Sequence, residues 1–216
     1  MAVSLRRFGL TAVVVTFLTG AISAGDLVLR TFDDDPVDVP PAGFTFSKSR
    51  QATPGTWFVR AWGTRHHLEH VADWGSAGGL SLAITGPAVK DVQVFARLQL
   101  VDGERTGGVL WRYQDWNNFY GVAIDLHRPE VALFRVTGGN RVRLDQVTEL
   151  DLDRDVAHTL LVRHEDDQIH VQLDGVGVLH VRDRGFVSAG RCGVWSAGAA
   201  KTWFDDLRIE EVSERR

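Results

Sequence analysis

Apolar and polar positions alternate with a period of two along most of the chain after residue 90. In residues 91–101, every second residue from Val92 to Leu100 is apolar, and most residues between them are polar. Such alternation is typical of a strand with one buried face. The pattern repeats between turn signals such as Asp102-Gly103 and Asp174-Gly175. It predicts strands at residues 91–101, 108–113, 119–126, 131–137, 141–148, 156–164, 168–174, 176–182, 190–196 and 201–212.

The segment before residue 91 is less regular. It predicts a proline-interrupted loop at residues 36–46. Strands are predicted at residues 27–34, 56–62, 67–72 and 80–85. Because many short strands follow one another without an amphipathic helix, the chain is predicted to be all-β, an antiparallel β-sandwich or jelly roll.

The first residues have the pattern of a secretory signal. Arg6 and Arg7 precede a short apolar stretch at residues 8–19, and the small residues Ala21 and Ala24 offer a cleavage point. The apolar stretch is shorter than the roughly 20 residues that span a bilayer. We therefore predict a signal peptide at residues 1–24, one domain at residues 25–216, a periplasmic or secreted location and no membrane attachment after cleavage. An uncleaved anchor is the alternative.

Charge and cysteine content narrow the possible partners. The formal net charge of the 216 residues is −4, with acidic and basic residues interspersed, so nucleic acid is not an expected partner. Cys192 is the only cysteine, so no internal disulfide can form, and its apolar surroundings predict a buried thiol. The sequence leaves the oligomeric state open.

Several motifs, taken in chain order, resemble the 3-keto-disaccharide hydrolase domain family. The motifs are Phe32-Asp-Asp-Asp35, Pro40-Pro-Ala-Gly-Phe44, Gly55-Thr-Trp57, Gly107-Gly-Val-Leu-Trp-Arg112 with Asp115, Asn118-Phe-Tyr120, His158-Thr-Leu160, Gln168 to Gly175, Gly190 to Trp195 and Phe204-Asp-Asp-Leu207. The resemblance implies a concanavalin A-like or laminin G-like jelly roll. Ala157 departs from the family, in which a tryptophan often precedes the histidine.

The resemblance also implies a hydrolytic activity toward 3-keto-glycosides. The hydrogen beside a ketone is acidified, so a base such as Asp125 or His158, with an arginine to stabilise the enolate, could carry such a reaction. No paired-carboxylate glycosidase motif is present along one strand. Whether the protein is an enzyme is therefore left open.

A ligand groove is predicted on the concave face of one sheet. Alternation places Arg112 and Asp125 on one face, with Gly121 and Ala123 leaving room between them. The candidate ligand-binding residues are Arg97, Arg112, Asp115, Trp116, Asn118, Asp125 and Arg135. The alternatives are a solvated outer face and, for Asp115 and Asn118, a purely turn-forming role.

Exposed tryptophans are candidate platforms for a sugar ring. Trp62, Trp74 and Trp116 fall in predicted turns, and Trp116 is the preferred platform. Trp111, Trp195 and Trp203 lie in apolar strand patterns and are predicted to be core residues.

Acidic residues near both ends suggest a structural calcium ion, although no cofactor is required. If the terminal strands pair, Asp33, Asp34 and Asp205 come together, and oxygen ligands of this kind suit calcium. Solvated carboxylates are the alternative. The motif His66-His67-Leu-Glu-His70 is interpreted as surface histidines and not as a zinc site, because His66 and His70 would lie about 13 Å apart on a strand.

Three functions remain open. The first is lectin-like recognition of a carbohydrate on the concave sheet face by an exported module. The second is hydrolysis of 3-keto-glycosides, and the third is a laminin G-like protein-interaction module.

Overall fold

The computed structural model describes residues 26–49, 55–71 and 79–212, which form fifteen strands and no helix. The strands are β1 (Asp26–Arg30), β2 (Thr45–Lys48), β3 (Thr56–Trp62), β4 (Arg65–Val71), β5 (Leu80–Val89), β6 (Val92–Gly103), β7 (Thr106–Asp115), β8 (Asn118–Asp125), β9 (Glu130–Thr137), β10 (Asn140–Val147), β11 (His158–Glu165), β12 (Gln168–Leu173), β13 (Val176–Arg182), β14 (Gly190–Ala197) and β15 (Ala200–Glu211).

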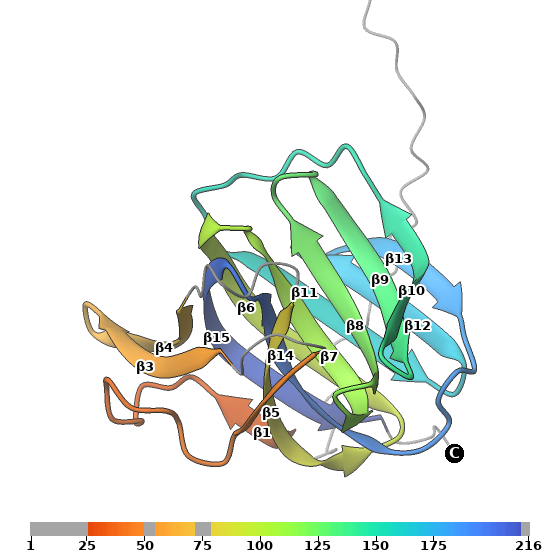
Figure 1. The fold of residues 1–216 in the computed structure, drawn as a ribbon, viewed down its shortest axis with the longest axis horizontal. Helices are drawn as coiled ribbons and strands as arrows, with labels where there is room; N and C mark the ends of the chain where they lie inside the picture. The colour runs from red at the N-terminus through yellow and green to blue at the C-terminus, as the bar shows by residue number, and fades with distance from the viewer. Residues whose placement is uncertain (1–25, 50–54, 72–78, 213–216) are drawn as a thin grey trace, which may run out of the picture.

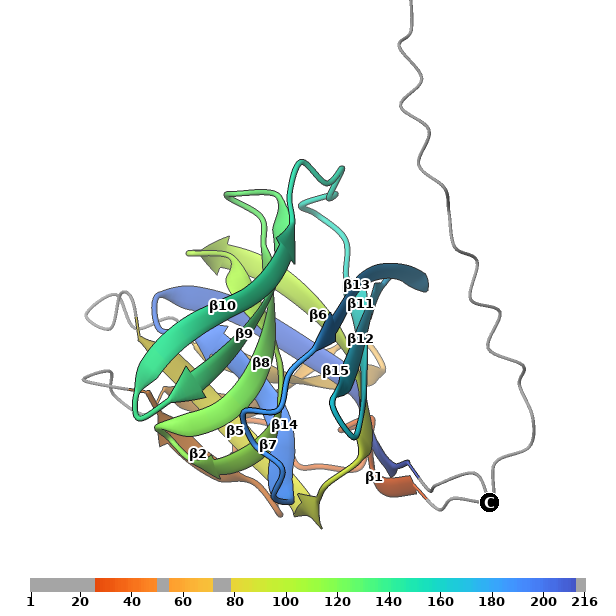
Figure 2. The same ribbon diagram turned by 90° about the vertical axis from the view of Figure 1, so that its right-hand side faces the viewer.

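The strands form two antiparallel sheets (Figure 1). One sheet has eight strands in the order β13-β12-β11-β6-β15-β4-β3, with β1 also paired to β15. The other has seven strands in the order β10-β9-β8-β7-β14-β5-β2. In Figure 2, β8, β9 and β10 of the second sheet lie apart from β11, β12 and β13 of the first. The prediction of an all-β antiparallel sandwich is therefore confirmed.

A large apolar core joins the two sheets. Val94 and Leu98 of β6 are buried in it with Val109 and Trp111 of β7, as the alternation along each strand predicts. Burying apolar side chains between two sheets is the main favourable term in the folding of such a sandwich.

One strand was missed by the sequence interpretation. Residues 36–46 were predicted to be a loop because of their prolines, yet β2 begins at Thr45 and pairs with β5 at the edge of the seven-stranded sheet. Phe44 and Phe46 pack against the core. An edge strand needs partners on one side only, so the nearby prolines do not prevent pairing.

The terminal strands pair as expected. β1 lies antiparallel to β15, with Arg30 opposite Leu207. Within the described ranges, no helix is long and apolar enough to cross a bilayer. The predicted signal segment, residues 1–24, lies outside the described residues.

Candidate functional site

Arg112 lies in a β-bulge and does not face outward. The register between β7 and β8 shifts between Trp111 and Asp115, and Arg112 has a φ of 46°. A bulge inserts an extra residue and re-aims the side chain. The prediction that Arg112 shares the outer face with Asp125 is therefore wrong.

The Arg112 side chain is fully buried, and each of its three guanidinium nitrogens donates a hydrogen bond. Its Nε donates to the carbonyl of Lys90 at 2.7 Å, and Nη1 donates to the carbonyl of Phe186 at 2.7 Å. Nη2 donates to the carboxylate of Asp91 at 3.2 Å and to the carbonyl of Asp166 at 3.1 Å. Burial lowers the pKa of Arg112, and the Asp91 carboxylate opposes that shift. Arg112 ties three loops together and has no donor aimed at an open groove.

Arg135 faces the core side of the seven-stranded sheet, not its outer side. It is paired in register with Tyr120, and its Nη1 donates to both carboxylate oxygens of Asp183, at 2.5 and 2.7 Å. The Tyr120 hydroxyl also donates to Asp183. Arg135 thus holds the segment after β13 and does not share a surface with Asp125.

Asp125 does lie on the outer face, where it organises a turn. It accepts hydrogen bonds from the backbone of His127 and Arg128 and from the Arg128 guanidinium, with Nη2 at 2.9 Å. Burial alone would raise the pKa of Asp125, but these hydrogen bonds lower it. A base with a lowered pKa that is already paired to arginine is poorly suited to take a proton near neutral pH.

The space expected at Gly121, between Arg112 and Asp125, is filled by an aromatic side chain. A Cβ on Gly121 would lie 2.5 Å from the Phe134 ring, so the ring occupies the space that the small residue leaves. Phe134 belongs to a second buried cluster with Leu110, Phe119 and Trp195. Around Gly121, the predicted binding surface is thus covered by the protein's own side chains.

Asp115, Trp116 and Asn118 form the β7–β8 turn. Asp115 accepts hydrogen bonds from the backbone of Asn117 at 2.7 Å and from the Asn118 amide at 3.0 Å. Asn118 in turn accepts a bond from the backbone of Gly138. These contacts support the turn-forming interpretation, while Trp116 remains 44% exposed.

His158 is buried on the other sheet from Asp125. Its Nδ1 lies 2.8 Å from the Asp174 carboxylate, and its Nε2 lies 2.8 Å from the Asp153 carbonyl. Burial would raise the pKa of Asp174, but bonds from His158 and Thr159 lower it. The structure does not bring together the two predicted catalytic residues.

A cavity of about 410 Å³ lies on the outer face of the eight-stranded sheet, between the β3–β4 hairpin and strands β6 and β15. We call it the hairpin pocket. It brings together the candidate platform Trp62, the candidate ligand-binding residue Arg97 and the candidate calcium ligand Asp205, which the sequence analysis did not place in one site. Its lining is Trp62, Gly63, Thr64, Arg65, His66, His67, Arg97, Leu98, Gln99, Ala157, Trp203, Phe204 and Asp205.

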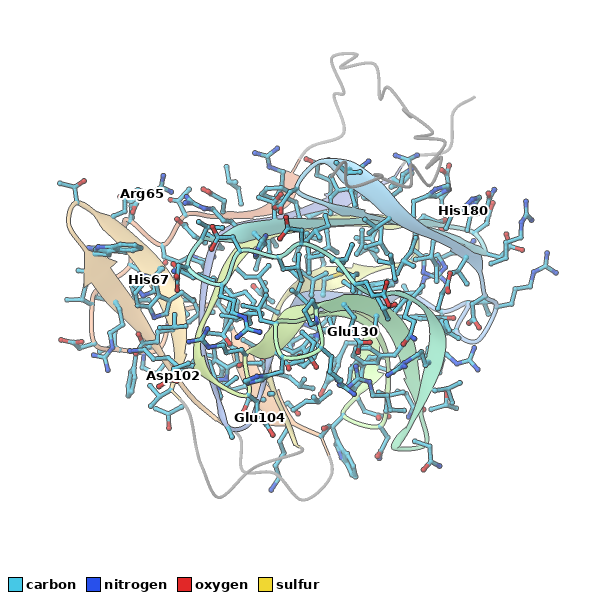
Figure 3. The ribbon with its side chains drawn as sticks, turned by 90° about the horizontal axis from the view of Figure 1, so that it is seen from above. Arg65, His67, Asp102, Glu104, Glu130 and His180 are labelled. Atoms are coloured by element: carbon cyan, nitrogen blue, oxygen red, sulfur yellow. The ribbon has the colours of Figure 1, made fainter. Side chains whose placement is uncertain are left out.

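Two tryptophans form an aromatic wall of the hairpin pocket. The rings of Trp62 and Trp203 lie 5.1 Å apart in an edge-to-face arrangement, and the His67 ring lies 4.5 Å from Trp203. Trp62 is 64% exposed. Figure 3 shows Arg65 and His67 at this end of the molecule, far from His180.

Trp203 was assigned to the core, but it faces outward. Thr202 and Phe204 are buried on β15, whereas Trp203 between them is half-buried and lines the pocket. Because side chains on a strand alternate between its two faces, Trp203 shares the outer face with Lys201 and Asp205, and this could have been predicted from the sequence.

A carboxylate fixes the Trp203 ring. The indole Nε1 donates to Glu69 at 2.6 Å, and Lys201 lies 3.3 Å from the same carboxylate. Burial would raise the pKa of Glu69, but bonds from His67 and Trp203 and the charge of Lys201 lower it to about 2. Glu69 is therefore an ionised anchor at neutral pH.

Arg65 and Asp205 form the charged rim of the pocket. Arg65 Nη2 lies 2.9 Å from Asp205 and 3.3 Å from Asp206. Burial raises the pKa of Asp205, and the carboxylates of Asp206 and Asp33 act in the same direction. Arg65 compensates part of this concentration of negative charge.

The histidine motif lies partly in this wall. His67 and His70 are buried, not at the surface as expected, and His70 Nδ1 lies 2.7 Å from the Ala200 carbonyl. His66 Nδ1 lies 3.1 Å from the carbonyl of Asp35. In the part of the chain that the structure describes, no group of three or more His, Cys, Asp or Glu side chains suits a metal ion.

A second, more open hollow of about 680 Å³ includes Asp125, Asp102 and Glu104. None of the described residues that line it is Trp, Tyr or Phe. Although its volume is larger, it offers no aromatic stacking surface, and we take the hairpin pocket as the better candidate.

Calcium binding by Asp33, Asp34 and Asp205 stays a prediction. Asp33 accepts a hydrogen bond from the backbone of His66, and Asp205 is held by Arg65. If calcium binds here, adding calcium to chelator-treated protein should raise the melting temperature. Asp205→Asn should abolish this increase. An unchanged melting temperature of the original protein on addition of calcium would contradict the prediction of a calcium site.

Comparison with known proteins identifies structures with a similar fold but no matching family. No protein-family model matches the chain, and no curated protein matches it. Among solved structures, the chain is similar to the carbohydrate-binding module CBM66 from Bacillus subtilis, with a TM-score of 0.64, 19% identity, and coverage of 78% of this chain and 96% of that one.

Two further structures have the same fold. Domain 4 of AbnA, a GH43 extracellular arabinanase from Geobacillus stearothermophilus, has a TM-score of 0.60, 13% identity, and coverage of 86% of this chain and 92% of that one. The exoplasmic domain of VIP36 in its Ca²⁺- and mannose-bound form has a TM-score of 0.54, 12% identity, and coverage of 82% and 85%. At these identities the likeness concerns the jelly-roll fold.

Proposed function

We propose that the protein is an exported, lectin-like module that binds carbohydrate in the hairpin pocket. Three of the solved structures with this fold are described as a carbohydrate-binding module or as a complex with a sugar. The signal-like segment at residues 1–24 supports export. The aromatic wall formed by Trp62 and Trp203 is the observation that carries the choice of site.

The composition of the hairpin pocket suits a sugar. Sugar rings have apolar C–H faces and polar edges, so a binding site needs aromatic faces beside polar groups. Trp62 and Trp203 supply the faces, while Arg97, Gln99 and Asp205 supply donors and acceptors around them. The volume of about 410 Å³ lies within the ~300–1,000 Å³ of small-ligand sites.

Replacing the stacking tryptophans is expected to abolish most binding. Trp62→Ala should weaken the affinity for a glycan bound by the original protein by about thirtyfold, about 2 kcal/mol, because a large exposed aromatic surface is lost. The measurement is a glycan-array screen followed by titration calorimetry on the best ligand. Trp116→Ala is the matched control, because Trp116 is also exposed but lies in the β7–β8 turn outside the pocket.

A second variant tests the pocket by filling it. Ala157 lines the cavity, at the position where the resembling family often has tryptophan. Ala157→Trp should therefore block binding while leaving the melting temperature nearly unchanged. Unaltered affinity in both Trp62→Ala and Ala157→Trp, or a loss confined to Trp116→Ala, would place the site elsewhere.

The motif resemblance supports an enzymatic alternative, hydrolysis of 3-keto-glycosides. Its signature is turnover of a 3-keto-glucoside by the purified protein and loss of turnover in Asp125→Asn or His158→Gln. Binding of glycans without turnover favours the lectin-like function.

A further inference from the structure

We propose that the hairpin pocket selects sugars that carry a carboxylate, namely uronic-acid residues, and that Arg97 holds this carboxylate. The inference rests on the proposed carbohydrate-binding function of the same pocket and specifies its ligand class. Among the described charged groups around the pocket, Arg97 is the cation that no acidic side chain pairs with.

The other cations around the aromatic wall are engaged by acidic side chains. Arg65 is paired with Asp205 and Asp206, Lys201 with Glu69, and Arg60 with Glu69 and Asp38. Each of these contacts neutralises a charge within the protein. These cations are therefore poor candidates for recognising an anion.

Arg97 differs from these cations. It lies on β6, exposed and lining the pocket. Its register neighbours are Thr159 on β11 and Asp205 on β15, yet Asp205 is taken by Arg65 and by the backbone of Asp206. Among residues 26–49, 55–71 and 79–212, no hydrogen bond or ion pair involves the Arg97 side chain.

An uncompensated arginine in a cavity favours an anionic ligand. The pocket lining contains two arginines and one carboxylate, and that carboxylate is already paired. A guanidinium binds a carboxylate through two parallel hydrogen bonds, and it does so more strongly than it binds a neutral acceptor. An exposed surface arginine is commonly only solvated, but Arg97 shares its cavity with two tryptophans.

The shape of a uronic acid fits this arrangement. Its carboxylate projects from the edge of the pyranose ring, roughly in the mean plane of the ring. A ring stacked on Trp203 or Trp62 therefore presents the carboxylate sideways, toward the pocket wall that β6 supplies. The same ring keeps hydroxyls free for Gln99 and Asp205, so stacking and ion pairing can occur together.

The test compares each acidic sugar with its uncharged counterpart. Oligomers of galacturonic, glucuronic, mannuronic and guluronic acid are titrated beside their methyl esters, which keep the ring and remove the charge. At low ionic strength we expect at least one acid to bind about tenfold or more tightly than its ester, and we expect the ratio to fall as salt is added.

Variants of Arg97 identify the group responsible. Arg97→Ala should reduce the acid-to-ester ratio to about one, because the acid loses an ion pair that the ester never forms and so loses more affinity than the ester does. Arg97→Lys should restore part of the preference. Arg208→Ala is the matched control, since Arg208 is another exposed arginine on β15 but does not line the pocket. It should leave the ratio unchanged.

The outcomes separate the two proposals. Equal binding of acids and esters, or a preference that survives Arg97→Ala, overturns the inference while the carbohydrate-binding function stands. Absence of binding to any acidic or neutral glycan overturns the proposed function and the inference with it.

Discussion

Replacing Arg112 with methionine is expected to lower the free energy of unfolding by about 3–5 kcal/mol, because a fully buried side chain loses four hydrogen bonds and leaves three backbone carbonyls without these donors. The side chain of Arg112 is fully buried, so methionine fills much of its volume but donates no hydrogen bond. The carbonyls of Lys90, Phe186 and Asp166 then lose the Arg112 donors, and the Asp91 carboxylate loses one of its donors but keeps the backbone N–H of Asp166. Urea unfolding followed by tryptophan fluorescence measures the change.

The control for this prediction is Arg97→Met, which removes the same charge from an exposed position on β6. It should change the free energy of unfolding by less than about 0.5 kcal/mol. If Arg112→Met costs no more than Arg97→Met, the four hydrogen bonds of Arg112 do not stabilise the fold as argued.

The Arg112 bulge marks the limit of what alternation along the chain can predict. The strand β7 was predicted correctly, because Val109 and Trp111 alternate with their neighbours. After Trp111 the bulge reverses the alternation of inward-facing and outward-facing residues. No residue type in β7 predicts this bulge. Gly190 on β14 is consistent with the bulge, since a Cβ there would lie 2.4 Å from the carbonyl carbon of Arg112.

For the hairpin pocket, individual residues were recognised as candidates from the sequence, but their proximity in one pocket was not predicted. The two walls of the pocket come from the β3–β4 hairpin and from β15, and Arg65 and Asp205 are 140 residues apart in the sequence. Trp62 was recognised as an exposed platform, and Arg97 as a ligand-binding candidate. Their meeting depends on which strands neighbour β15, and strand order is not encoded in the period of any single strand.

The filled outer face of the other sheet has a similar cause. Gly121 was interpreted as space for a ligand because small residues leave room. In the sheet, Phe134 lies opposite Gly121 on the paired strand β9, and its ring covers the glycine. A cross-strand neighbour therefore decides whether a glycine opens a cavity or admits an aromatic ring.

Protonation of His164 is expected to lower the folding stability of the protein in mild acid. This side chain is buried between the sheets, where Trp111 Nε1 donates to its Nδ1 at 2.9 Å. The Tyr120 ring lies 5.2 Å away. Burial lowers the pKa of His164 to about 3, and the charge of Arg112 adds to the shift. The folded protein therefore keeps His164 neutral well below the pH at which an unfolded chain would protonate it.

The sign of the pH dependence follows from this difference. Because the folded pKa lies below the unfolded value of 6.5, the unfolded chain binds the additional proton, and stability falls as the pH decreases from about 6.5 toward about 3. The whole window corresponds to about 5 kcal/mol, or about 1.4 kcal/mol per pH unit. The lowered pKa values of Glu69, Asp174 and Asp183 add a further loss, which begins near pH 5 and is largest below pH 4.

Unfolding measured between pH 6.5 and 4.5 therefore reports mainly the histidine contribution, about 2 kcal/mol over this interval. His164→Gln retains an acceptor for Trp111 and should flatten the slope in this interval. His170, whose pKa is also lowered by burial and by the neighbouring His180, is the matched comparison because it is less buried. His170→Gln should remove a smaller part of the slope than His164→Gln. An unchanged slope in His164→Gln would contradict the prediction, because it would mean that folding does not lower the pKa of His164.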